Sequence, residues 1–253
     1  MRSDIDVRRQ SVNPLIHPTA VIGEDVEIGE GTQIGPYAVI QGKVRIGKKN
    51  RIFPGVTIGL EPQILGGKGG GFVEIGDENI FREHVTIHAS SGDKTKTQIG
   101  NQNFLMVGAH IAHDCCIQNN VIITNNVALG GHVTVEDRAV LGGLTGVHQF
   151  VRIGKYAMVG GLSRIVMNIL PFSMAAGNPT RFIGLNLIGL KRAGLTAAAV
   201  GDIKKAFNAL FLKGLLLKDA LEAIKPLAKS SKEVQYLVRF IEDSKKRGFT
   251  RKH

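Results

Sequence analysis

The sequence predicts a mainly β protein, a left-handed parallel β-helix followed by a C-terminal α-helical domain. Three observations predict it: aliphatic residues recur every six positions over most of the chain, this repeat stops after Ile165, and helix-capping patterns follow it. We therefore divide the 253 residues into an N-terminal extension (1–15), a β-helix domain (16–189) and a helical domain (190–253).

The six-residue repeat runs in two registers. Isoleucine occupies seven consecutive repeat positions from Ile22 to Ile58, and an aliphatic residue occupies twelve from Ile99 to Ile165. Three residues extend the second register backwards, namely Ile75, Phe81 and Ile87. This spacing fits neither a helix nor an alternating strand, but it fits one flat face of a triangular coil with about 18 residues per turn. We expect the aliphatic residues to point into the prism, with Gly or Asn permitting the bend at each corner.

Two segments interrupt the repeat. Ile75 follows Ile58 by seventeen positions, enclosing LEPQILGGKGGG, and ASSGDKTK at 89–96 breaks the pattern once, at Asp93. A regular coil expels an insertion as a loop, so we expect both segments outside the prism, where loops often carry function. For the second segment, a loop without a role is an equally good interpretation.

The chain after Ile165 is predicted to leave the prism at PFSMAAGNPTRF and to form three helices. Thr196 caps a helix to about residue 212, residues 218–228 form the second, and SSKE at 230–233 resembles a capping box that opens the third, to about residue 246. From residue 190 onward, 15 Lys or Arg face 6 Asp or Glu, so this part carries nine of the net charge of +11.

Composition sets the class of protein. No stretch approaches the roughly 18 apolar residues of a membrane span, and the polar start MRSDIDVRRQSVN lacks the apolar segment of a secretion signal. The two cysteines, Cys115 and Cys116, are adjacent, which is poor geometry for a disulfide and typical of reduced thiols. We expect a soluble, cytoplasmic protein.

The stretch AHIAHDCC at 109–116 is the strongest candidate site. Residues 18 apart stack on neighbouring turns at about 4.8 Å, so His113 is expected beside Gly131 and Asp114 beside His132. A general base, an acidic residue to orient it and an unobstructed backbone N–H then lie together. These groups can deprotonate a hydroxyl and stabilise the oxyanion of a thioester carbonyl, which is the chemistry of acyl transfer.

A metal site is the alternative interpretation, because β-helices of this type also hold zinc between three histidines, as in the γ-class carbonic anhydrases. The candidate ligands are His110, His113, His132 and His148, the last stacked on Gly130. However, His110 and His113 are only three residues apart along a flat face, and HDCC would be an unusual mixed set of metal ligands. We therefore favour catalysis without a metal or cofactor, and we interpret Cys115 as core filling.

Six motifs together resemble the UDP-N-acetylglucosamine O-acyltransferases that begin lipid A biosynthesis: VTIHAS, AHIAHDC, LGGHV, GVHQF, AAGNP and GLNLIGLKRAG. The resemblance runs from residue 16 to residue 248. It implies a homotrimer with active sites between subunits, which transfers an (R)-3-hydroxyacyl group from acyl carrier protein to the 3-hydroxyl of the sugar.

The resemblance also implies residue roles. His113 becomes the general base, Asp114 supports its protonated form, Gly131 donates to the oxyanion, and Gly161 bounds the acyl chain, where a glycine leaves room for a longer one. The positions expected to contact substrate are Gln63, His88, His110, His132, His148 and Gln149, with Asn186 and Arg192 at the donor or the nucleotide phosphates.

The sequence departs from the family pattern in the first interrupting loop. The family usually has QDLK there, and this chain has QILGGKGG: Ile64 replaces the acid, and Lys68 replaces the lysine only if the glycine-rich segment folds back. Ile188 also stands where many members carry an acid. An acceptor with an amine at carbon 3 therefore stays open beside the hydroxyl acceptor, as does the acyl chain length.

Two other classes of protein fit the sequence less well. A β-helix binding protein without catalysis is disfavoured because His113, Asp114 and Gly131 are all present. The sister N-acyltransferase carries an additional N-terminal domain, for which the residues before His17 are too few.

The basic helices predict an acidic partner. They lack an aromatic stacking platform or a nucleic-acid motif, so nucleic acid is not expected. We expect an acidic acyl carrier protein to dock at the residues around Lys191, Arg192, Lys204 and Lys205.

Overall fold

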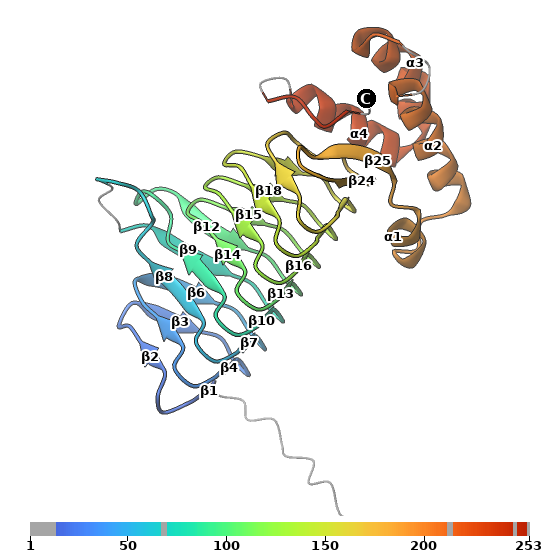
Figure 1. Cartoon of the computed structure of the whole chain (residues 1–253). Helices are drawn as coiled ribbons and strands as arrows, with labels where there is room; N and C mark the ends of the chain where they lie inside the picture. Colours follow the sequence, from blue (N-terminus) through green and yellow to red (C-terminus); the bar gives the residue numbers. More distant parts are fainter. Residues whose placement is uncertain (1–13, 67–69, 212–214, 245–246, 252–253) are drawn as a thin grey trace, which may run out of the picture.

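The protein is a three-sided prism of short parallel strands with helices at its C-terminal end, four of them in the described residues (Figure 1). The computed structural model describes residues 14–66, 70–211, 215–244 and 247–251. The chain winds as a left-handed coil, so each turn supplies one strand to each face, and strands from successive turns pair in parallel. The predicted β-helix is therefore confirmed.

The three faces are sheets A, B and C, which the chain visits in that order. Sheet A consists of β1 (Leu15–Ile16), β4 (Gln33–Ile34), β7 (Arg51–Ile52), β10 (Ile80–Phe81), β13 (Phe104–Leu105), β16 (Ile122–Ile123), β19 (Val140–Leu141), β22 (Met158–Val159), β24 (Ser173–Ala176) and β25 (Arg181–Leu185). Sheet B consists of β2 (Val21–Ile22), β5 (Val39–Ile40), β8 (Thr57–Leu60), β11 (Thr86–His88), β14 (His110–Ile111), β17 (Ala128–Leu129), β20 (Gly146–Val147) and β23 (Arg164–Ile165). Sheet C consists of β3 (Val26–Ile28), β6 (Lys43–Ile46), β9 (Phe72–Ile75), β12 (Lys96–Ile99), β15 (Cys116–Ile117), β18 (Thr134–Val135) and β21 (Arg152–Ile153).

The register of the paired strands shows which turns of the coil contain the two interrupting segments. Ile28 pairs with Ile46 across one regular turn, whereas the turns from Ile46 to its partner Ile75 and from Ile75 to its partner Ile99 are both longer. The two interrupting segments therefore lengthen these turns while the parallel pairing continues, with one register shift between β8 and β11 at His88. Both leave the prism between a strand of sheet B and the next strand of sheet C, an edge that we call the B–C edge.

The aliphatic repeat residues fill the prism. Those from Ile34 to Ile165 that continue the six-residue pattern are 5% exposed or less and form one core cluster. Cys115 is fully buried among them, and burial raises the pKa of its thiol to about 12, so it fills the core as predicted. Burial of one aliphatic side chain stabilises a fold by about 1.5–3 kcal/mol, and the repeat supplies one such residue on every face.

The corners differ from the prediction that Gly or Asn would occupy them. Among the described residues, fifteen other than glycine adopt a positive φ near 60°, and two of these are asparagine, Asn120 and Asn126. The others are as varied as Tyr37, Arg138 and Leu162, but none is β-branched. A side chain with a single substituent on Cβ tolerates this backbone region better than a β-branched one, so the corner excludes Val, Ile and Thr rather than requiring Asn.

The coil also continues past Ile165, where the repeat ends, and β24 lies inside PFSMAAGNPTRF, so the chain is still part of the prism where this predicted exit segment begins. Ile169 bridges to Ile153, and β24 pairs in parallel with β22. These partners are closer in sequence than partners across a regular turn, and the shortened turn removes the six-residue signal while keeping the register. The strand β25 then pairs antiparallel with β24 and ends the sheet.

Four helices follow, α1 (Leu187–Arg192), α2 (Ala197–Phe211), α3 (Leu217–Ser230) and α4 (Lys232–Asp243). The three predicted helices are confirmed, and Thr196 Oγ1 accepts from the Ala199 N–H at 3.2 Å, as a cap should. The short α1 was not predicted. The cap of α4 is Ser231 rather than Ser230, and α4 ends at Asp243. None of the described helices is long and apolar enough to cross a membrane.

The helices pack on the last coil through a second core that draws on Leu170 and Phe172. A buried carboxylate fixes the contact: Glu136 accepts from Arg152 Nε at 2.6 Å and from the Tyr236 hydroxyl of α4. The Glu136 side chain is 2% exposed, so loss of Arg152 would leave its buried negative charge without a partner, which is strongly destabilising. This network holds α4 against the prism.

Candidate active site

A groove runs along the outer surface of sheet B toward the B–C edge. Small residues form its floor, and histidines and glutamines border it. Its lining residues are Gln63, His110, Ala112, His113, Ala128, Leu129, Gly130, Gly131, Gly146, Val147, His148, Gln149, Arg164, Ile165 and Val166. The groove thus collects five of the predicted substrate or catalytic side chains and leaves apolar space beside them.

His113 and Asp114 form a hydrogen-bonded pair at this edge. Nδ1 of His113 lies 2.7 Å from Oδ2 of Asp114, and their side chains are 14% and 5% exposed. An ionised carboxylate only accepts hydrogen bonds, so Nδ1 carries the proton and Nε2 keeps its lone pair. The side chain is therefore set up as a base whose free nitrogen is Nε2.

Asp114 remains ionised because its surroundings favour the charged form. Burial raises its pKa, but polar contacts from Thr95, His113 and Ser91 outweigh burial and lower the pKa to about 2. The Ser91 N–H donates to Oδ2 at 3.1 Å, and the Asp114 N–H donates to Thr97 Oγ1 at 2.9 Å. The carboxylate is thus fixed in place and stabilises a protonated His113 during proton transfer.

Gly131 lies directly against the His113 ring, as the stacking of successive turns predicted. A Cβ at position 131 would come within 2.4 Å of Cε1 and 2.5 Å of Nε2 of His113. Among the described residues, the Gly131 N–H has no hydrogen-bond acceptor, whereas its neighbours donate to Val147 O and His113 O. A free N–H beside a free imidazole nitrogen is the arrangement that acyl transfer needs.

His132 extends the pair into a cluster. Its Nε2 lies 3.8 Å from Oδ2 of Asp114, its ring meets that of His113 edge-on at 5.2 Å, and Phe150 stacks on its other side at 4.5 Å. The ligand atoms of His113, Asp114 and His132 lie within 4.8 Å of one another. Among the described residues of one copy this is the group of three close ligand atoms, and two of the four histidines of the metal alternative, His110 and His148, lie outside it.

His88 and His110 form a second histidine pair, from the neighbouring strands β11 and β14 of sheet B. Their rings meet edge-on at 5.0 Å, and His110 Nδ1 bonds Thr86 Oγ1 at 2.7 Å. Burial lowers the pKa of both, and a neighbouring histidine lowers it further, so both are neutral at physiological pH. Nδ1 of His88 is buried with no partner among the described residues. Neutral, partly unsatisfied imidazoles are suited to bind sugar hydroxyls.

The other predicted residues fall on different parts of the prism. His148, Gln149 and Gln63 are exposed at the B–C edge. Gly161 lies at the opposite side of sheet B, where sheet A ends. Asn186 lies beside Tyr156 at the third edge, where its amide donates to the Tyr156 carbonyl at 2.9 Å and its oxygen caps α1 by accepting from the Gly189 N–H at 3.0 Å.

Arg192 at the end of α1 is exposed, and so is Ile188. Lys68 lies outside the described residues. No single copy of the chain therefore brings Asn186, Arg192 and Gly161 to the groove of His113.

Sequence reasoning missed the residues that hold the histidines. Ser91 and Thr97 fix Asp114, Thr86 fixes His110, and Phe150 stacks on His132. Ser91 belongs to the second interrupting segment, so this loop touches the site. A signal existed for Phe150, since it follows His132 by one regular turn and occupies the same corner.

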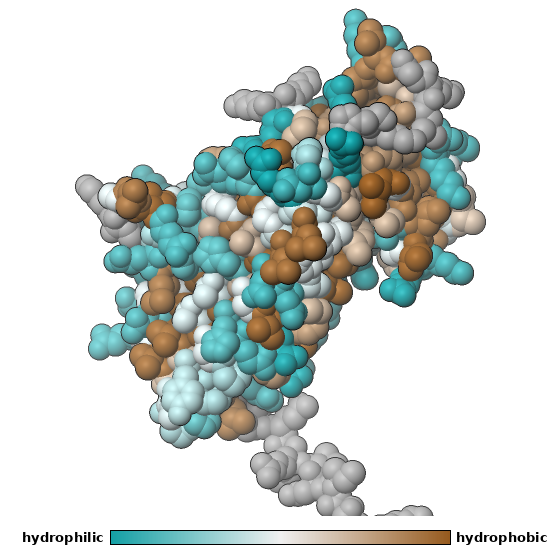
Figure 2. Space-filling model, viewed as in Figure 1, coloured by the Kyte–Doolittle hydropathy of each residue, from teal (hydrophilic) through white to brown (hydrophobic). Residues whose placement is uncertain are grey.

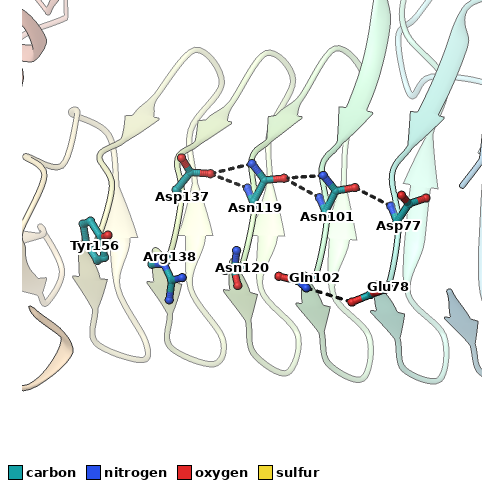
Figure 3. A pocket seen from close by; sticks show the side chains of 9 residues that line it. All are labelled: Asp77, Glu78, Asn101, Gln102, Asn119, Asn120, Asp137, Arg138 and Tyr156. Carbon is teal, nitrogen blue, oxygen red and sulfur yellow. Dashed lines mark hydrogen bonds between the residues drawn. The ribbon is translucent and has the colours of Figure 1, made fainter. Parts of the chain in front are cut away.

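A second hollow, on the edge between sheets C and A, offers different chemistry (Figure 3). Its side chains form a ladder in which Asp137 accepts from Asn119, Asn119 from Asn101, and Asn101 from the backbone of Asp77. These amides and carboxylates already bond to one another and stabilise the corner turns. The histidine-lined groove is therefore the candidate active site.

Comparison with known proteins identifies the family. Residues 168–250 match the model described as UDP-N-acetylglucosamine O-acyltransferase, domain 2, and residues 13–42 and 25–59 match the bacterial transferase hexapeptide model. The acyl-[acyl-carrier-protein]–UDP-N-acetylglucosamine O-acyltransferase of Gloeothece citriformis is 50% identical over 207 residues, which are 81% of this chain and 75% of that protein. The chain belongs to the UDP-N-acetylglucosamine O-acyltransferase family.

Two further members of the family are similar to this chain over most of its length. The enzyme of the same name from Synechocystis sp. is 43% identical over 88% of each chain. The crystal structure of the UDP-N-acetylglucosamine O-acyltransferase from Moraxella catarrhalis is 38% identical, covers 94% of this chain and 96% of that one, and superposes with a TM-score of 0.80. The protein is thus an acyltransferase, and the metal-enzyme and binding-protein alternatives are not favoured.

Proposed function

We propose that the protein transfers an (R)-3-hydroxyacyl group from acyl carrier protein to the 3-position of UDP-N-acetylglucosamine, the first step of lipid A biosynthesis. The observation that carries the proposal is the hydrogen-bonded pair of His113 and Asp114 against Gly131, beside a groove floored by small residues. Membership of the acyltransferase family supports the donor and the acceptor.

In this mechanism Nε2 of His113 removes the proton from the acceptor group as it attacks the thioester carbonyl. Asp114 stabilises the imidazolium that forms, and the Gly131 N–H donates to the carbonyl oxygen as negative charge develops there. Collapse of the tetrahedral intermediate forms the new ester and expels the thiolate of the carrier arm, which takes the proton from His113. The neutral pair of His88 and His110 lies along the path where the sugar would bind.

A homotrimer completes the site. The predicted substrate residues occupy three different edges of one prism, so Gly161 and Asn186 reach the groove of His113 only if they come from another copy. The outer surface of sheet A carries a half-buried apolar row suited to such an interface, formed by Ile80, Phe104, Ile122, Val140 and Met158. Exposed apolar side chains also interrupt the polar surface in Figure 2, and Leu144, Phe150 and Leu162 at the corners are 55–72% exposed.

The acceptor is decided by one assay. UDP-N-acetylglucosamine and its 3-amino analogue are each tested with a panel of 3-hydroxyacyl carrier proteins, and product is measured as ester or amide. We expect turnover with the hydroxyl acceptor. Turnover with the amine alone would change the acceptor while leaving the acyl transfer intact, and no turnover in any combination would refute the proposed function.

Substitution of Gly161 by Met is expected to shorten the preferred acyl chain. A Cβ at this position already lies 3.1 Å from the Gly143 carbonyl oxygen, so a longer side chain must point away from Gly143, and in the proposed trimer it would meet the groove of a neighbouring copy. Excluding two methylenes, at about 0.8 kcal/mol each, changes the ratio of kcat/KM between long and short donors roughly tenfold. The measurement is this ratio across the donor panel, and an unchanged ratio would show that another residue limits the chain.

Reversal of Lys204 and Lys205 to Glu is expected to raise the KM for acyl carrier protein. Both are exposed on α2, although Lys205 also pairs with Asp202 at 3.0 Å. Attraction between exposed charges weakens when salt shortens the Debye length to roughly 8 Å, so the double variant should lose most of the salt dependence of KM. The control carries the same charge change at Lys43 and Lys48 on the prism. Equal curves for the two variants would exclude α2 as the docking surface.

A further inference from the structure

Arg247 joins the C-terminal segment to the catalytic groove. Its Nη1 donates to the carbonyl oxygen of Val166 at 3.1 Å and lies 3.4 Å from Nδ1 of His148. Both Val166 and His148 line the groove that holds His113. A residue that follows the last helix therefore contacts the site assembled by the prism.

The backbone of Arg247 and of the residues that follow it is anchored. Its N–H donates to the Ser244 carbonyl at 3.3 Å, and the following residues bond Asn168, which donates to the Gly248 carbonyl at 3.2 Å and accepts from the Thr250 N–H at 2.9 Å. The Phe249 side chain is 5% exposed in the second core. The guanidinium is thus held in position before any ligand arrives, which reduces the entropy that binding must cost.

A third hollow, distinct from the one between sheets C and A, adjoins the groove at Val166. Arg247 lines this third hollow and contacts two residues of the groove. The hollow is lined by Thr134, Phe150, Arg152, Val166, Asn168, Asp243, Ser244 and Arg247. Its other arginine is already paired, because Arg152 bonds Glu136 at 2.6 Å and lies 3.5 Å from Asp243. In the part of the chain that the structure describes, Arg247 pairs with no carboxylate.

We propose that Arg247 binds a phosphate-ester oxygen of a substrate at the mouth of the groove, beside His148. A guanidinium with unused N–H donors matches two phosphate oxygens in a planar fork, and it is more weakly hydrated than an ammonium group. The proposal rests on the proposed function, because both substrates of that reaction carry such groups: the nucleotide diphosphate and the phosphodiester of the carrier's pantetheine arm. Arg247 is therefore a specificity residue that lies outside the predicted contacts.

The test compares Arg247→Gln and Arg247→Lys with Arg251→Gln, a control that removes a positive charge from the exposed arginine of the same segment. KM is measured for each substrate, together with kcat, the thermal unfolding temperature and the binding of UDP by calorimetry. A hydrogen bond to a charged group is lost in Arg247→Gln, so one KM should rise about ten- to a hundredfold, with kcat changed less than threefold. Arg247→Lys should recover part of the affinity, and Arg251→Gln should match the wild type.

The measurements for the two substrates distinguish the two possible sources of the phosphate group. Weaker UDP binding with a raised KM for the nucleotide sugar assigns the contact to the diphosphate, and a raised KM for the carrier protein alone assigns it to the pantetheine arm. Both KM values within twofold of wild type would overturn the proposal, as would a loss of kcat that accompanies a lower unfolding temperature. Absence of turnover in the wild type itself would instead count against the proposed function, and UDP binding would still test Arg247.

Discussion

Replacement of His113 by Ala is expected to reduce kcat by about a hundred- to ten-thousandfold, the usual effect of losing a general base. Among the described residues, the ring supplies the only free imidazole nitrogen that lies against Gly131, and Asp114 holds it there at 2.7 Å. Because the side chain lies on the outside of the coil, the prism core is untouched. The measurement is the rate of acyl transfer at saturating substrate, with the oligomeric state followed by light scattering.

The matched control is His17→Ala, since His17 is an exposed histidine whose side chain bonds only its near neighbour Thr19 within the described residues. This variant should keep full activity. If His113→Ala retained most of the wild-type rate, His113 would not be the base, and the neighbouring His132 would become the first residue to test.

Replacement of Gly131 by Ala is expected to have the second largest effect, a loss of about a hundredfold in kcat, as follows when a reacting group is displaced by about 1 Å. The new methyl group would overlap the His113 ring at 2.4 Å, and the ring cannot move away without stretching its bond to Asp114. The position is buried at a corner, so the methyl group has no open side.

The control for this prediction is Gly184→Ala, because a Cβ at Gly184 meets nothing within 4 Å. Activity and unfolding temperature of that variant should stay at wild-type values. For Gly131→Ala, kcat should fall while the unfolding temperature changes by only a few degrees. A fully active Gly131→Ala would show that the ring has more freedom than its contacts indicate.

The fold could be predicted because one residue in every six obeys the same constraint, that it must be apolar. Each aliphatic repeat residue faces a prism core, and the core accepts nothing polar there, so the periodicity survives in the sequence. Corners carry no comparable signal: Tyr37, Glu78 and Leu144 all adopt a similar positive φ, and what the described corner residues share is that none is β-branched. The shortened turn after Ile153 was also hidden, because its length shifts the next aliphatic residue out of phase.

The candidate site was predictable only where two functional residues stack on neighbouring turns of regular length. That rule placed His113 against Gly131 and Asp114 beside His132. It could not find Ser91, whose backbone N–H bonds Asp114, because an insertion lengthens the turn between them and any residue type has an N–H. It could not find Arg247 either, since that residue lies far from His148 in the sequence and the contact depends on how α4 packs on the last coil.

The central claim is acyl transfer by a histidine base, and one measurement tests it most directly. The purified protein, treated with a chelator, is incubated with a 3-hydroxyacyl carrier protein and UDP-N-acetylglucosamine, and the nucleotide sugar is weighed by mass spectrometry. We expect the sugar to gain the mass of one 3-hydroxyacyl group at the same rate with and without the chelator. A rate that disappears on chelation and returns with zinc would contradict the account, because His113, Asp114 and His132 would then be metal ligands.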